Sequence, residues 1–210
     1  MDENFINFFV FAILLMIIYM YLESRSYEVV YVKSKLDGRD YLVRNMSDKE
    51  DASDLLSKIR SKLITLVNHL KDIDDADVNN YLGDNDTIED VKDGFNRLVK
   101  RFRPDNISES TPNDKYTSYS VNKGQKIVFC LRSRKGEEKL VDENIITFVA
   151  LHELAHIMTV SVGHTEEFWN NFKILLRVGI KLELYRHQNF NNKPVDYCGT
   201  KITDTPLKKL

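Results

Sequence analysis

The chain has 210 residues, of which 42% are hydrophobic and 30% charged, and its net charge at neutral pH is −2. This length allows one hydrophobic core of ordinary size plus appendages. The near-neutral charge provides no overall positive field for holding a polyanion, which argues against a nucleic acid partner.

The first predicted element is an uncharged apolar helix at residues 5–22, FINFFVFAILLMIIYMYL. Eighteen helical residues span roughly 27 Å, enough to cross the hydrocarbon core of a bilayer. A cleavable signal peptide is the alternative, but the residues before the segment are acidic where a signal peptide carries basic ones. We therefore expect residues 1–25 to form a single transmembrane anchor, with membrane contact through residues 5–22.

The distribution of basic residues predicts the orientation of this anchor. None precedes the apolar segment, whereas several follow it closely: Arg25, Lys33, Lys35 and Arg39. By the positive-inside rule, the C-terminal domain should face the cytoplasm. Three N-x-S/T triplets should then stay free of glycans, those starting at Asn45, Asn85 and Asn106.

Cysteine usage favours a reducing compartment. The chain has two cysteines, Cys130 and Cys198, and no CxxC pair. Two isolated cysteines do not indicate a disulfide framework, so we expect both to be reduced.

Residues 26–112 are expected to form a juxtamembrane hairpin and a helical region. Asp37-Gly38 lies between two runs rich in β-branched and aromatic residues, a strong hairpin signal. Leucine and isoleucine at helical spacing predict an amphipathic helix over residues 53–71, packed on its own domain. Thr87 should cap a further helix that Pro104 ends, and residues 103–115 are typical of a loop.

Residues 113–210 are expected to form the main domain. YTSYSV and QKIVFCLR predict a hairpin whose turn contains Gly124. The hairpin strand before the next helix either offers an open edge to an extended peptide or, as most such strands are, is simply part of the sheet. Residues 145–158 are helical in pattern and largely apolar. Thr165 should start another helix, and the chain beyond Tyr185 is typical of a loop.

The helix at residues 145–158 carries the motif H-E-x-x-H. His152 and His156 are four positions apart, so both imidazoles project from one helix face and can bind one metal ion. Glu153 lies beside them, where a carboxylate can take a proton from water activated by zinc. This chemistry suits the hydrolysis of an amide. With five histidines in 210 residues, a chance match to the motif is roughly a 1% event.

A catalytic zinc ion needs a third protein ligand, and His164 is the natural candidate. On a continuous helix it would lie roughly 12 Å beyond His156, so the chain must turn back. The β-branched residues of TVSVG weaken the helix, and Gly163 can adopt the left-handed conformation of a helix cap. Glu166 and Glu167 are competing ligands, although each could instead stabilise the first turn of the next helix. Tyr185, Tyr197 and Arg132 are open candidates for a group that polarises the scissile carbonyl.

The motifs HELAH and GHTEEFW resemble the WLM and SprT-like (Spartan) zinc protease domains. The flanking segments YSVNKGQKIVFCLR and YCGTKITDTPL resemble membrane-anchored versions encoded by large cytoplasmic DNA viruses. The resemblance implies an α+β, zincin-like fold in which the active helix lies against a small β-sheet. It assigns His152, His156 and His164 as zinc ligands and Glu153 as general base. The spacing from His156 to His164 differs from both families, and the chain lacks their basic DNA-binding tail, so a role on DNA–protein crosslinks is not expected.

Two hypotheses follow. The first is a membrane-anchored zinc metallopeptidase, with residues 113–210 as the zincin-like core, acting on protein or peptide substrates at a viral or host internal membrane. The second is a virion membrane or assembly protein in which zinc is structural and no peptide is cleaved.

Overall fold

Helices and strands mix in an α+β arrangement in a computed structural model that describes residues 3–25, 29–82, 87–111, 113–134 and 136–207. The helices are α1 (Glu3–Arg25), α2 (Lys49–Lys71), α3 (Asp75–Asn79), α4 (Ile88–Arg101), α5 (Glu143–Met158) and α6 (Glu166–Lys181). The strands are β1 (Val29–Lys33), β2 (Asp40–Arg44), β3 (Ile107–Glu109), β4 (Tyr119–Val121), β5 (Lys126–Phe129), β6 (Val195–Tyr197) and β7 (Thr200–Ile202). The predicted α+β class is confirmed. Asn85, the start of one predicted glycosylation triplet, lies outside the described residues.

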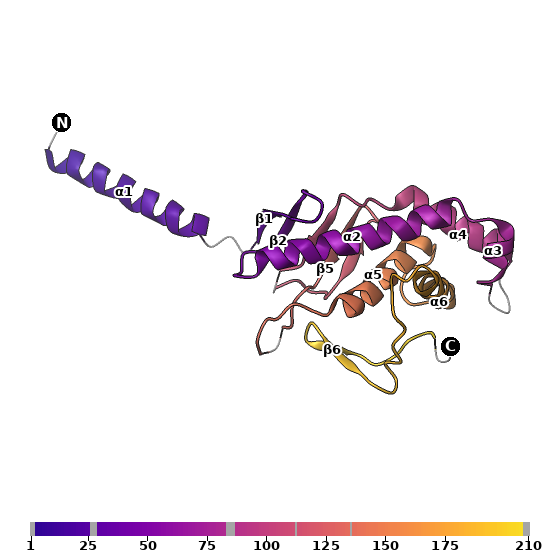
Figure 1. The fold of residues 1–210 in the computed structure, drawn as a ribbon. Coiled ribbons are helices and arrows are strands. Elements are labelled where there is room, and N and C mark those ends of the chain that lie inside the picture. Colours follow the sequence, from indigo (N-terminus) through magenta and orange to yellow (C-terminus); the bar gives the residue numbers. More distant parts are fainter. Residues whose placement is uncertain (1–2, 26–28, 83–86, 112, 135, 208–210) are drawn as a thin grey trace.

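Helix α1 extends away from the rest of the chain (Figure 1). Its segment from Phe5 to Leu22 has a mean hydropathy of 2.5, and none of it is buried. The helix is therefore long and apolar enough to cross a membrane, and no other described element covers it.

The main sheet has five strands in the order β1-β2-β3-β5-β4. Both predicted hairpins are present, β1 with β2 and β4 with β5, each antiparallel. Strand β3 joins them by pairing parallel to β2 and to β5, with Ser108 opposite Leu42 on one side and Val128 on the other. Strand β4 consequently lies at one edge of this sheet.

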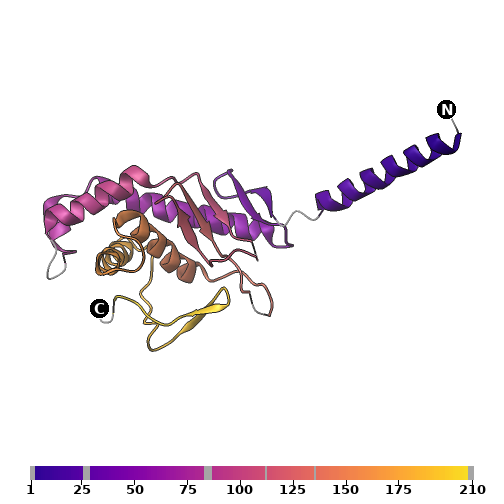
Figure 2. The same cartoon turned by 180° about the vertical axis from the view of Figure 1, so that it is seen from behind.

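Two helices pack on the sheet and bring the histidine motif under it. Helix α2 lies along β1, β2 and β3, and α5 lies beside α2 and against β4 and β5 (Figures 1 and 2). Helices α4 and α6 then pack on α5. The amphipathic stripe predicted for residues 53–71 is buried in this core, as expected of a helix that packs on its own domain.

Two segments expected to be loops contain strands. Residues 103–115 include β3, whose three residues are all buried. The chain beyond Tyr185 includes the β6–β7 hairpin. Strand β3 is too short and too polar to be recognised alone, because its place in the sheet depends on partners far away in the sequence.

The prediction of reduced cysteines is wrong for this structure. Cys130, which follows β5, forms a disulfide with Cys198 in the turn between β6 and β7, and the two Cα atoms are 6.3 Å apart. The two residues are separated by 68 positions in the sequence, so no local cysteine spacing predicts that they pair. The disulfide fastens the C-terminal hairpin to the main sheet.

Candidate metal centre

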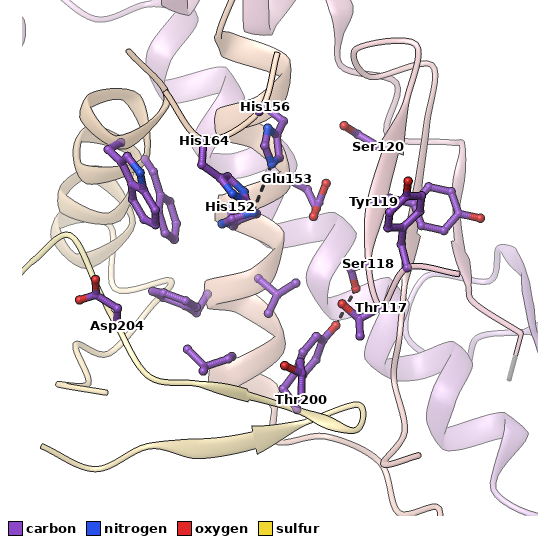
Figure 3. Close-up of a pocket in the computed structure, with 18 of the residues that line it drawn as sticks. Thr117, Ser118, Tyr119, Ser120, His152, Glu153, His156, His164, Thr200 and Asp204 are labelled. Carbon is purple, nitrogen blue, oxygen red and sulfur yellow. Dashed lines mark hydrogen bonds between the residues drawn. The ribbon is translucent and has the colours of Figure 1, made fainter. Parts of the chain in front are cut away.

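Three imidazoles converge between α5 and α6 (Figure 3). The Nε2 atom of His152 is 3.2 Å from Nε2 of His156 and 3.1 Å from Nε2 of His164. The ligand atoms of all three residues lie within 4.8 Å of one another. Two nitrogens bound to one tetrahedral zinc ion at 2.0–2.1 Å would be about 3.3 Å apart. The separations of His152 from its two neighbours therefore fit a single shared ion.

The chain reverses direction to bring His164 back to the motif. Helix α5 ends at Met158 and is followed by the extended cap residue Thr159. Gly163 has a φ of +87°, the left-handed conformation predicted for it. Thr165 then caps α6 by accepting a hydrogen bond from a backbone N–H in its first turn. The predicted break and the predicted cap are both present.

The competing ligands do not belong to this centre. The Glu167 carboxylate accepts hydrogen bonds from the backbone N–H groups of Val160 and Ser161. Glu166 is exposed and lines a separate depression between α4 and α6. Neither residue is among the converging metal-ligand groups of the described chain.

Phe168 supports all three imidazoles from the first turn of α6. Its ring centroid is 4.8 Å from that of His152, 4.3 Å from His156 and 4.7 Å from His164. The Phe168 side chain is fully buried. It limits how the three imidazoles can rotate, although the sequence indicated only that an aromatic residue follows the third histidine.

Burial keeps two of the histidines neutral. Burial, with a smaller contribution from His156 and His164, lowers the pKa of His152 to about 3. Burial, with a smaller contribution from His164 and Lys123, lowers the pKa of His156 to about 4. Metal binding requires neutral imidazoles. At neutral pH an ion would therefore displace no proton from these two side chains.

Glu153 is buried beside the histidines and points from α5 toward β4 (Figure 3). Burial raises the pKa of its carboxyl to about 8, although a hydrogen bond from the Ser120 backbone acts in the opposite direction. A cation bound by the histidines would favour the ionised carboxylate, because opposite charges a few ångströms apart stabilise each other. The carboxyl is thus in a position to exchange a proton at this site.

The histidines and Glu153 open into a cleft of about 920 Å³. One wall is polar and comes from the edge strand β4 and the residues before it, including Ser118 and Ser120. The opposite wall contains apolar side chains of α5 and α6, including Trp169. Residues of the β6–β7 hairpin close one end of the cleft. Its size and its mixed polar and apolar lining suit an extended peptide.

Only one of the three open candidates for polarising a carbonyl lines the cleft. Tyr197 does, but its hydroxyl donates to the carbonyl of Cys130 at 3.0 Å and lies 2.6 Å from Oγ of Ser118. Tyr185 packs against Phe148 in the core. Arg132 is buried in ion pairs with Glu109 and Asp48, away from the cleft. Those ion pairs join sequence positions too distant to be recognised in advance.

Comparison with known proteins links this chain to one family. The model of the WLM domain matches residues 92–207. An uncharacterized protein of Acanthamoeba polyphaga mimivirus is 34% identical over 197 residues, which cover 94% of this chain and 93% of the relative. An uncharacterized protein of Invertebrate iridescent virus 6 is 41% identical over 69 residues, 32% of this chain and 38% of that relative. No solved structure matches the chain significantly.

Proposed function

The chain belongs to the WLM domain family, and we propose that it is a membrane-anchored, zinc-dependent metallopeptidase that hydrolyses peptide bonds in protein substrates. One observation carries the proposal: three imidazole nitrogens converge beside a buried carboxyl group in an open cleft. The three imidazoles alone would not indicate a peptidase, because a structural metal site also gathers such ligands. A structural site, however, needs neither an adjacent acid nor access for a substrate.

Zinc is the ion that best suits these donors. The set consists of three nitrogen donors within reach of one point, with no described carboxylate or thiolate among them. Three histidines leave a fourth tetrahedral position open, as catalytic zinc sites do. On this proposal the domain is zincin-like: α5 is the active helix, His152, His156 and His164 hold the ion, and the sheet edge β4 lies above it.

A zinc ion in this site would supply Lewis acidity, which lowers the pKa of water toward 7 and polarises a carbonyl group. Glu153 would accept the proton of the attacking water and deliver it to the leaving amine nitrogen. The edge strand β4 would bind the substrate backbone in extended form beside Glu153. The hydroxyls of Ser118 and Tyr197, which lie 2.6 Å apart, both line the cleft.

We further propose that α1 anchors the enzyme in a membrane with the peptidase domain on the cytoplasmic face. The positive charges follow the apolar segment and do not precede it. The disulfide favours an oxidising compartment instead, so the orientation needs a direct test. Asn45 and Asn106 are both exposed, which makes them natural glycosylation reporters. Expression with microsomes should leave both unmodified, whereas added glycans would reverse the proposed orientation.

The central test measures bound zinc and peptide cleavage together, using the full chain in detergent micelles and labelled casein as substrate. We expect one zinc per chain, markedly weaker binding in His164→Ala, and full zinc content in Glu153→Gln. The Glu153→Gln protein should lose about 10²- to 10⁴-fold in cleavage rate, because a general base contributes on that order.

Two outcomes would reject the peptidase. A folded native protein without zinc would remove the metal site altogether. Stoichiometric zinc without cleavage, combined with unfolding when zinc is removed, would favour the assembly protein with a structural zinc ion.

A further inference from the structure

The loop between α5 and α6 carries His164 but has little apolar contact to hold it. Val160 and Val162, its two bulky apolar residues, are 62% and 87% exposed. His164 itself is exposed, in contrast to the two helix histidines. A loop exposed in this way samples many conformations unless polar contacts fix its backbone. The position of the third imidazole therefore depends on what binds the loop backbone.

A lysine from the sheet binds the carbonyl groups of this loop. Lys123 lies in the β4–β5 turn, where its φ is +53°. Its Nζ atom donates to the carbonyl oxygens of Thr159 at 2.9 Å, Ser161 at 2.8 Å and His156 at 3.3 Å. An ammonium group has three N–H donors, and each one finds a carbonyl here. One side chain thus joins the end of α5 to the loop that follows it.

A glutamate from α6 binds the N–H groups of the same loop. Oε1 of Glu167 accepts from the backbone N–H of Val160 at 2.8 Å. Oε2 accepts from the backbone N–H of Ser161 at 3.1 Å and from the Ser161 hydroxyl at 2.8 Å. Arg97 of α4 lies 3.6 Å from the same carboxylate. Hydrogen bonds to a charged acceptor are stronger than those between neutral groups.

We propose that Lys123 and Glu167 are positioning residues for the third metal ligand: by binding the carbonyl and the N–H of Ser161, they hold His164 beside His152 and His156. The inference rests on the proposed metal site. Neither side chain is among the metal-ligand groups, so both act through the loop backbone. If either contact is lost, the loop must be ordered at the moment the ion binds, and that ordering lowers affinity.

Two substitutions test this, each with a matched control. Lys123→Met removes the ammonium group, and Lys126→Met removes a lysine three positions along the same hairpin. Glu167→Gln leaves one acceptor oxygen in place of two, and Glu166→Gln makes the same change on the neighbouring residue. Zinc affinity is measured by chelator competition on the full chain in detergent, and the Co²⁺ absorption spectrum reports ligand geometry.

We expect Lys123→Met and Glu167→Gln to weaken zinc binding by about 10- to 100-fold, the range found when groups that orient metal ligands are replaced. The controls should stay within about twofold of the native protein. In a His164→Ala background the same two substitutions should have no further effect, because the ligand that they position is gone. Circular dichroism of the metal-free proteins verifies that each variant is folded.

Three results would overturn the inference: native affinity in both variants, equal losses in the controls, or equal losses with and without His164. Absence of zinc from the native protein would instead reject the metal site itself, so the two failures are distinguishable. If Lys123→Met does not fold, Ser161→Ala serves in its place. It removes the hydroxyl contacts with Glu167 and with the α6 cap residue Thr165, and should weaken zinc binding about fivefold.

Discussion

Cys198 is bonded to Cys130 across 68 positions of sequence, and this bond joins the turn of the β6–β7 hairpin to the end of β5. Both residues are almost completely buried. The hairpin closes one end of the cleft, so the disulfide connects that end to the sheet whose edge strand forms the polar wall. The shape of the cleft consequently depends on an oxidised cysteine pair.

Loss of this disulfide should lower the free energy of unfolding. Restricting a loop of 68 residues contributes about 4 kcal/mol in the chain-entropy description, and measured losses are typically about 2–5 kcal/mol. Urea unfolding of the native protein with and without a strong reductant, and of Cys198→Ser, should show this decrease. Equal unfolding midpoints in all three samples, or free thiols in the untreated native protein, would contradict it.

The raised pKa of Glu153 predicts how the stability of the metal-free protein depends on pH. The carboxyl titrates near 4.5 when unfolded and at about 8 when folded, so between these values the folded state holds a proton that the unfolded state has lost. Stability should therefore fall as the pH rises from about 4.5 to 8. Glu153→Gln removes this titration. Between pH 5 and pH 8, its free energy of unfolding should rise relative to that of the native protein by on the order of 3 kcal/mol.

Chemical unfolding in the presence of a chelator measures this difference, with Glu166→Gln as the exposed control. If the free energy of unfolding changes equally with pH in Glu153→Gln and in the native protein across this range, Glu153 is ionised in the folded metal-free state. Added zinc should reduce the difference, because a nearby cation favours the carboxylate.

A buried ion pair supports β3, the strand that sequence analysis did not recognise. Arg132 donates from Nε to Glu109 at 2.9 Å and from Nη1 to Asp48, while the other Glu109 oxygen accepts from the backbone N–H of Arg44 at 2.7 Å. Arg132→Met would leave Glu109 buried without its counter-charge and should cost about 3–5 kcal/mol.

Two further variants, which leave no unpaired charge in place of Glu109 or change only an exposed pair, should cost much less stability than Arg132→Met. The double variant Arg132→Met, Glu109→Leu should recover much of the loss, because no buried charge remains. Lys139→Met, which removes one member of an exposed pair, should change stability by less than about 0.5 kcal/mol. If Arg132→Met and the native protein have the same midpoint of urea unfolding, the ion pair does not stabilise the sheet.

Two glycines with left-handed backbones differ in the space around them. At Gly124, with φ of +105°, a Cβ atom would lie 2.9 Å from the carbonyl oxygen of Arg101 and 3.0 Å from a methyl group of Ile157. At Gly38, with φ of +69°, it would meet nothing within 4 Å. Gly38→Ala should therefore cost about 1 kcal/mol from backbone strain alone, and Gly124→Ala about 2–4 kcal/mol. Thermal unfolding of the two variants compares them directly, and equal losses would mean that the close contacts at Gly124 relax freely.

Local signals in the sequence predicted much of the fold and most of the candidate centre. Asp37-Gly38 indicated a hairpin, and Thr87 and Thr165 each start a helix as expected. The spacing of the three histidines and the glycine between them predicted that they would meet, because a helix and its cap are decided by neighbouring residues.

Contacts between distant residues could not be predicted in this way. Strand β3 is polar in sequence, and it is buried between β2 and β5 with its Glu109 paired to Arg132, which follows β5. The same reason applies at the centre, where Lys123 reaches across from another hairpin to the loop before His164. No period or motif encodes such a contact, because it exists only after the sheet has assembled over α5.

A ribosome releases β2 well before β3, because the parallel partner of Leu42 is Ser108. Helices form within about a microsecond, whereas pairing of strands so far apart along the chain is slow. During synthesis α2 and α4 can therefore form while the sheet is still incomplete, and α6 and the C-terminal hairpin emerge later still. The apolar helix α1 leaves the ribosome before the other described elements, whereas the third histidine follows only after α5. On the proposed function, a newly made chain would therefore reach its membrane before its metal site is complete and before it could cleave a substrate.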